Sequence, residues 1–155
     1  MRRVPFVLAA LVVAACWRSP RVTTNPATGD IDLDFAGSGP TEQWRSAVLP
    51  VEGSGVSGSA TVDRVDGGTR AGVTINGTPG GVLPWHIHEG RCGTEGRIVG
   101  PATAYPLLHV GDDGHATAMA HLTDVKLNRT RDYHVDVHPS AGRLTEVVAC
   151  GALEG

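Results

Sequence analysis

Short runs of β-favouring residues, interrupted repeatedly by glycine, proline, asparagine or aspartate, constrain the fold of this chain more than any other feature. Its 155 residues include 21 glycines and 10 prolines, and aromatic residues make up only 5%. Breaks of this kind turn the chain between short strands, so the pattern is typical of an all-β domain. No stretch shows helical periodicity. We therefore expect a Greek-key antiparallel β-barrel or sandwich of about seven to eight strands.

The runs predict strands at residues 45–49, 55–64, 70–75, 82–88, 116–122, 133–138 and 145–149. The segments Asp66-Gly67-Gly68 and Asp112-Asp113-Gly114 contain residues that tolerate positive φ. Each is therefore expected to turn a hairpin. The longest irregular segment is the predicted loop at residues 90–106, and we find no internal repeat.

The N-terminus has the layout of a secretory signal. Two arginines are followed by an apolar stretch at residues 4–15 and then by Cys16. That stretch is too short to span a bilayer. Because Val13-Ala14-Ala15-Cys16 resembles a bacterial lipobox, we expect a signal peptide at 1–15 and acylation of Cys16. The protein would then be exported and lipid-anchored in the cell envelope. The alternative is a plain signal peptide that is cut elsewhere.

Composition divides the rest of the chain. Residues 16–41 are rich in proline, threonine, serine, glycine and aspartate, which indicates a flexible linker. Residues 42–155 are of ordinary single-domain size and can bury a core. A formal net charge of −3 argues against a nucleic-acid partner, since a basic patch would be expected for one.

The cysteines fit the same compartment. With Cys16 used for lipid, Cys92 and Cys150 remain as one even pair in an exported chain, and a disulfide is expected between them. The alternative is two unrelated reduced thiols.

Two histidine-rich strands carry the candidate chemistry. In Trp85-His86-Ile87-His88 the two-residue period of a strand puts the histidines on one face and the apolar residues on the core face. In the strand from Tyr133 to His138 the same alternation turns His134, Asp136 and His138 away from the core. We expect these side chains on the outside of the barrel. Asp136 could orient a ligand histidine, but we favour a solvated carboxylate. The histidines converge only if the strands are neighbours beneath a covering loop, for which residues 90–106 are the candidate.

Imidazole suits copper and zinc, and a His-x-His pair on one strand brings two ring nitrogens to one ion. On its own such a pair is a weak signal, because surface histidines on a polar face give the same pattern. Its context strengthens the prediction. Segments in the same order resemble the Cu/Zn superoxide dismutase family: Leu83-Pro84-Trp85-His86-Ile87-His88-Glu89-Gly90, Val135-Asp136-Val137-His138 and Val148-Ala149-Cys150-Gly151.

The resemblance implies a Greek-key barrel, with His86, His88 and His138 as copper ligands and Cys92–Cys150 as the structural disulfide. It also implies superoxide as the substrate. Several of the family's elements are missing. Between Cys92 and Leu108 there is no histidine to bridge copper to zinc. His109-Val110-Gly111-Asp112 resembles a zinc-binding segment, but the other ligands of a four-coordinate site are not visible, so zinc is not expected.

The family's anion-attracting arginine is also missing. Val147 occupies its position, and Arg143 lies nearby only in sequence. Such a cation raises the local concentration of a small anion. Without it, no residue is assigned a catalytic role.

Three hypotheses remain open at this point. The first is a copper-dependent superoxide dismutase or a dismutase-like remnant. The second is a protein that captures or buffers copper without turnover, helped by one of the other histidines, His109, His115, His121 or His134. The third is a structural or interaction module, because His86-Ile87-His88-Glu89-Gly90 followed by Cys92-Gly93 also resembles the chordin-type domain.

Overall fold

The computed structural model describes residues 21–24, 31–34, 42–78 and 80–155. The chain divides into two compact units, Met1–Gly39 and Pro40–Gly155. In the first, β1 (Arg21–Thr24) and β2 (Ile31–Asp34) pair antiparallel, so the segment interpreted as a linker contains a short strand pair. The predicted signal peptide and Cys16 lie outside the described residues. No helix among the described residues is long and apolar enough to cross a membrane.

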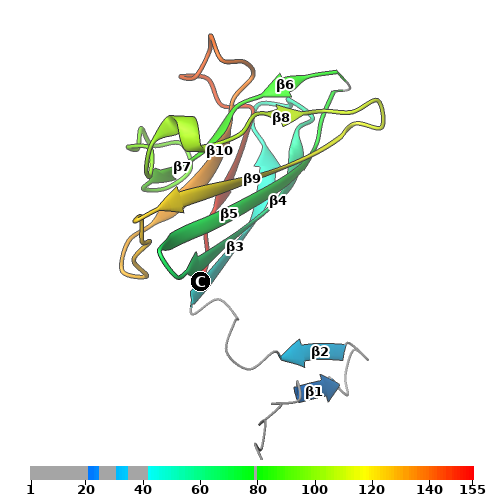
Figure 1. The fold of residues 1–155 in the computed structure, drawn as a ribbon. Helices are drawn as coiled ribbons and strands as arrows, with labels where there is room; N and C mark the ends of the chain where they lie inside the picture. Colours follow the sequence, from blue (N-terminus) through cyan, green and yellow to red (C-terminus); the bar gives the residue numbers. More distant parts are fainter. Residues whose placement is uncertain (1–20, 25–30, 35–41, 79) are drawn as a thin grey trace, which may run out of the picture. The chain divides into compact units, whose positions relative to one another are not determined.

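One curled antiparallel sheet of seven strands forms the body of the second unit (Figure 1). In spatial order the strands are β7 (Trp85–Glu89), β10 (Tyr133–Val137), β11 (Ala149–Ala152), β3 (Glu42–Pro50), β4 (Ser57–Val65), β5 (Gly68–Asn76) and β9 (His115–Thr123). The short strands β6 (Val82–Leu83) and β8 (Leu108–His109) form a second small sheet. The chain crosses between the ends of the large sheet after β5, β7 and β9, as in Greek-key folds. The predicted all-β class is confirmed.

Six of the seven expected strands form within a few residues of the predicted ranges. Pro84 divides the fourth into β6 and β7, because proline has no backbone N–H to donate. The seventh was wrong: β11 begins only at Ala149. The preceding residues form a loop instead, in which Val148 N–H donates to the Val137 carbonyl and the Glu146 carbonyl accepts a side-chain hydrogen bond.

Both predicted turns form, but only one of them joins paired strands. Asp66 and Gly67 connect β4 to β5, whose end residues Val65 and Gly68 are partners. At the second turn, Gly114 N–H donates to the Gly111 carbonyl over 3.0 Å. The strand before that turn, β8, pairs with β6 and not with β9.

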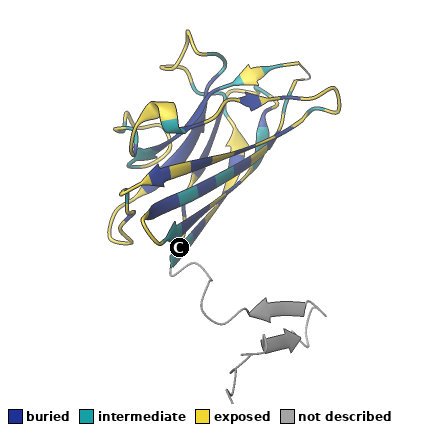
Figure 2. Ribbon diagram, viewed as in Figure 1, coloured by how far each residue is buried: buried dark blue, intermediate teal, exposed yellow. Residues whose placement is uncertain are grey.

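The core is formed by the inward face of each strand (Figure 2). Along β9 the residues are alternately exposed and buried without exception. In β7 and β10 the core residues Trp85, Ile87, Val135 and Val137 are at most 1% exposed. Burial of each such side chain stabilises the fold by about 1.5–3 kcal/mol. The core thus holds the two histidine-bearing strands firmly.

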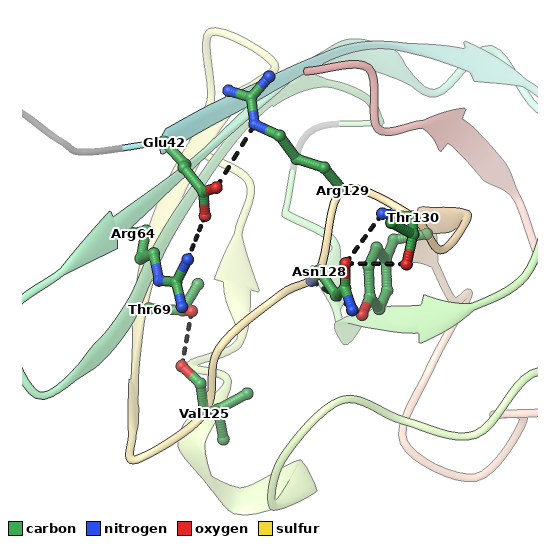
Figure 3. Close-up of polar contacts among 8 residues, drawn as sticks. Glu42, Arg64, Thr69, Val125, Asn128, Arg129 and Thr130 are labelled. Carbon is green, nitrogen blue, oxygen red and sulfur yellow. Dashed lines mark hydrogen bonds and ion pairs between the residues drawn. The ribbon is translucent and has the colours of Figure 1, made fainter.

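Polar contacts connect the loop that leads into β10 with residues of β3, β4 and β5 (Figure 3). Glu42 at the start of β3 pairs with Arg64 and, over 3.7 Å, with Arg129 of that loop. Thr69 donates a 2.7 Å hydrogen bond to the Val125 carbonyl. The contacts join β3 and β5 directly to the loop, and β4 only through Glu42, so the approach to β10 is fixed at two points.

The loop is also braced from within. The side-chain oxygen of Asn128 accepts from both the backbone N–H and the hydroxyl of Thr130, each at 2.9 Å (Figure 3). Asn128 N–H in turn donates to the Tyr133 hydroxyl over 3.2 Å. Such turns are a common use of asparagine side chains. These hydrogen bonds fix the position of Tyr133, the first residue of β10, and thereby help to set the register of that strand.

Candidate metal centre

The two histidine-bearing strands are direct neighbours. β7 and β10 pair antiparallel, with His88 opposite His134 and His86 opposite Asp136. Side chains of directly opposed residues lie about 5 Å apart on the same face of a sheet. The arrangement confirms that the polar side chains of the two strands share one face, although 46 or more residues separate the pairs in sequence.

That face is buried, although we had expected it to be exposed to solvent. His86 is 5% exposed, His138 1%, His134 0% and Asp136 6%, whereas His88 is partly exposed. Parts of three loops border a cavity over this face: residues 51–54, 93–96 and 144–148. The interpretation of Asp136 as a solvated carboxylate was therefore wrong. Residues 93–96 belong to the loop that we expected as a cover, whereas the other two segments were not predicted, because alternation along a strand identifies the face but not the loops over it.

His86, His88 and His138 form the candidate metal site. One nitrogen from each lies within 4.8 Å of the others. The ring centroids are 5.3 Å apart for His86 and His138, 5.9 Å for His86 and His88, and 6.0 Å for His88 and His138. Among the described residues this is one of two groups whose donor atoms could hold a metal ion.

Backbone carbonyls set the tautomers of two of the rings. His88 Nδ1 is 2.9 Å from the Gly96 carbonyl, and His138 Nδ1 is 2.8 Å from the Glu146 carbonyl. A neutral ring that donates from Nδ1 has a lone pair on Nε2. Both Nε2 atoms, and Nδ1 of His86, are buried without a hydrogen-bond partner. Buried polar atoms are rarely left unpaired, and a bound ion is one recognised reason for such an exception.

The electrostatics favour the neutral form of two of the three rings. Burial and, to a smaller extent, the nearby His138 and His88 lower the pKa of His86 from 6.5 to about 4, although Asp136 opposes them. Burial also lowers the pKa of His138, although its bond to the Glu146 carbonyl acts in the opposite direction. Because a metal binds neutral imidazole, these rings need not lose a proton at neutral pH before they bind.

Beside the cluster lies a buried pair, His134 and Asp136. His134 Nδ1 is 3.0 Å from the Gly90 carbonyl, and its Nε2 is 3.3 Å from Asp136 Oδ2, without the alignment of a hydrogen bond. Burial lowers the pKa of His134, but Asp136 and the Gly90 carbonyl outweigh that effect and raise it overall. Only a protonated imidazole presents N–H groups to both acceptors. The second carboxylate oxygen, Oδ1, is buried and has no partner.

The predicted disulfide is confirmed. Cys92 and Cys150 are bonded, with Cα atoms 5.9 Å apart, and they tie the loop after β7 to β11. Cys150 also lies near His134 and Asp136 in the second group of potential ligands. A disulfide sulfur is not the thiolate that metals bind, so that group is not a metal site.

The remaining histidines do not join the cluster. His109, His115 and His121 are exposed, as is Asp112. None belongs to a group of three metal-binding side chains among the described residues. Arg143 is exposed and pairs with Glu146 over 3.1 Å, whereas Val147 borders the cavity.

Sequence reasoning missed Tyr105, which lies at the edge of the cluster. Its ring is 5.3 Å from that of His86 and 5.1 Å from that of Trp85. Its hydroxyl donates to the Val99 carbonyl over 2.6 Å, and burial raises its pKa. A single tyrosine in an irregular loop gives no periodic signal, so only the folded chain reveals that it packs against the ring of His86.

No protein-family model and no curated protein matches this chain. The interpretation of the site therefore depends on its geometry.

Proposed function

We propose that this chain is an exported protein that binds one copper ion through His86, His88 and His138, and that it is a divergent relative of the Cu/Zn superoxide dismutases. Two observations carry the proposal: one nitrogen from each of the three rings lies within 4.8 Å of the others, and each ring has a buried nitrogen without a hydrogen-bond partner. Two of the rings are held in the required tautomer by carbonyl groups. Such outer contacts are what orient imidazole ligands in metal sites.

Copper is favoured by the chemistry of the donors. Three imidazoles without a thiolate or a carboxylate suit copper, zinc, iron and nickel, and Cu(II) binds most tightly among the divalent first-row metals. When bound, copper would supply one-electron redox chemistry. The chain's own residues hold it: the carbonyls of Gly96 and Glu146 orient two rings, and Tyr105 packs against the third.

The disulfide is consistent with an exported, non-cytoplasmic protein, since such bonds persist in oxidising compartments. We extend this to a lipid anchor at Cys16 and a place in the bacterial cell envelope. Labelling with a radioactive fatty acid tests the anchor, and loss of the label in Cys16→Ser is the expected result. Equal labelling of both proteins would exclude Cys16 as the acylated residue.

Copper binding is tested on the metal-free full chain by equilibrium dialysis against Cu(II) and Zn(II). We expect one tightly bound copper per chain, loss of binding in His86→Ala and His138→Ala, and retention in the control His121→Ala, which changes an exposed histidine of β9. Copper that is retained in His138→Ala would contradict the proposal. Absence of binding would leave the structural or chordin-like alternative.

Superoxide dismutation is the second candidate function. It is favoured by the cavity of about 800 Å³ that borders His88 and His138, because a small molecule in it would reach a metal held there. Superoxide turnover by the copper-loaded chain tests it, with His138→Ala as the inactive control. Copper binding without turnover would indicate a carrier or buffer.

A further inference from the structure

The cavity over the histidine cluster is bordered by acidic side chains. Glu52, Glu95 and Glu146 come from the three separate loops that surround it, and all three are exposed. Its described lining contains neither arginine nor lysine. Three carboxylates around one opening attract cations and repel anions, most strongly at low ionic strength.

Two of these charges are uncompensated. Glu146 pairs with Arg143 over 3.1 Å. For Glu52 and Glu95, no ion pair is found within the described part of the chain. The local field at the opening is therefore negative.

The floor of the cavity supplies independent evidence for a cationic ligand. Asp136 and His138 both border the cavity and are 6% and 1% exposed. Asp136 Oδ1 and His138 Nε2 have no hydrogen-bond partner. A carboxylate oxygen and an imidazole lone pair are both acceptors, so what they lack is a metal ion or a proton donor, not an anion.

The backbone at Glu52 also favours this interpretation. Glu52 and Gly53 have φ values of 49° and 72°, and Ser54 N–H donates to the Val51 carbonyl over 3.1 Å. Consecutive residues with positive φ form the type of turn that favours asparagine, aspartate and glycine. A glutamate there carries a conformational cost, and residues in such conformations cluster at functional sites.

We propose that the acidic opening admits a cation to the histidine cluster, so that the species that enters from solvent is the copper ion itself and not superoxide. The inference rests on the proposed copper site and refines it: capture and release of copper is then the main function, and attraction of an anionic substrate is not built into the opening. Glu52 and Glu95 provide the attraction, and the unpartnered Asp136 Oδ1 at the floor is an acceptor for the ion.

The test uses the metal-free full chain in a mild detergent and a double variant, Glu52→Gln/Glu95→Gln. The matched control, Asp66→Asn/Asp112→Asn, removes two exposed carboxylates that do not border the cavity. Stopped-flow quenching of tryptophan fluorescence measures the rate of Cu(II) capture at low and at high salt. Azide, a small anion, is then titrated into each copper-loaded protein and followed by its effect on the Cu(II) absorption spectrum.

We expect the glutamate variant to capture Cu(II) about fivefold more slowly at low salt, and to bind azide several-fold more tightly than the unchanged chain. The control variant should match the unchanged chain in both measurements. High salt should remove the difference in capture rate.

Equal capture rates and equal azide affinities in all three proteins would overturn the inference, as would capture that accelerates with salt. Equilibrium dialysis separates this failure from that of the proposed function. If copper binds and is lost in His138→Ala while the glutamates have no effect, only the entry of a cation through the acidic opening is wrong. If the unchanged chain binds no copper, both proposals fail.

Discussion

Mild acid should destabilise the metal-free protein, and His86 sets most of the effect. Its pKa falls from 6.5 to about 4 on folding, because burial and the neighbouring histidines disfavour the charged ring. The unfolded chain therefore binds more protons than the folded chain between these values. In that window the free energy of unfolding rises with pH and falls as pH is lowered.

The magnitude follows from the two pKa values. Each unit of difference between the folded and unfolded pKa of His86 is equivalent to about 1.4 kcal/mol of unfolding free energy. At and below pH 4, His86 therefore lowers the free energy of unfolding by about 3 kcal/mol relative to neutral pH. Between pH 7.5 and pH 5, about 2 kcal/mol of this is lost. The lowered pKa of His138 acts in the same direction. His134 acts in the opposite direction, because its raised pKa stabilises the fold below pH 6.5 and that stability is lost as pH rises.

The assay is urea unfolding of the metal-free full chain at pH 7.5 and pH 5, followed by fluorescence. His86→Gln removes the titrating ring, so its free energy of unfolding should change much less between the two values. His121→Ala, at an exposed position, is the control and should retain the full loss. A stability that does not change with pH in the unchanged chain, or an identical loss in His86→Gln, would show that burial of His86 does not make the fold sensitive to acid.

Three further predictions concern the supports of the site. Removing the disulfide with Cys92→Ser/Cys150→Ser should lower the free energy of unfolding by about 4 kcal/mol, because the bond closes a separation of 58 residues; urea unfolding measures this, and a loss below about 1 kcal/mol would contradict it. Asp136→Asn should weaken Cu(II) binding about tenfold, because a buried carboxylate beside the ligands is lost. The control Asp112→Asn, at an exposed position, should leave the affinity unchanged. Equal affinities of the two variants by calorimetry would argue against a role for Asp136. Gly96→Ala should also weaken copper binding, because its Cβ would lie 1.9 Å from the Glu89 carbonyl oxygen and displace the loop that orients His88. Gly142→Ala is the control, since its Cβ meets nothing within 4 Å. An unchanged affinity in Gly96→Ala would show that the Gly96 carbonyl is dispensable for copper binding.

Much of the fold follows from local pattern. Strict alternation in β9 and the apolar positions of β7 and β10 define strands and their core faces, because the side-chain period of a strand is two. The residues before β11 show where this fails. Thr145, Val147 and Val148 are β-branched and favour a strand locally, but they form a loop beside the cavity. Tertiary hydrogen bonds override the local preference there.

Some features of the metal site could likewise be predicted from the sequence, and others could not. The face that His86, His88 and His138 occupy on their strands could be predicted from alternation, whereas the pairing of the two strands was only a condition for their convergence. The burial of Asp136 and the acceptors at Gly96 and Glu146 could not be. These depend on how irregular loops fold over the sheet, and backbone carbonyls have no signature in sequence.

Copper binding by three histidines is tested most directly by electron paramagnetic resonance of the full chain loaded with one equivalent of Cu(II), prepared with ¹⁴N-histidine and with ¹⁵N-histidine. We expect hyperfine coupling from three histidine nitrogens, and coupling from fewer after His86→Ala, His88→Ala or His138→Ala. Coupling from fewer than three histidines in the unchanged chain, or a spectrum unaffected by all three substitutions, would contradict it.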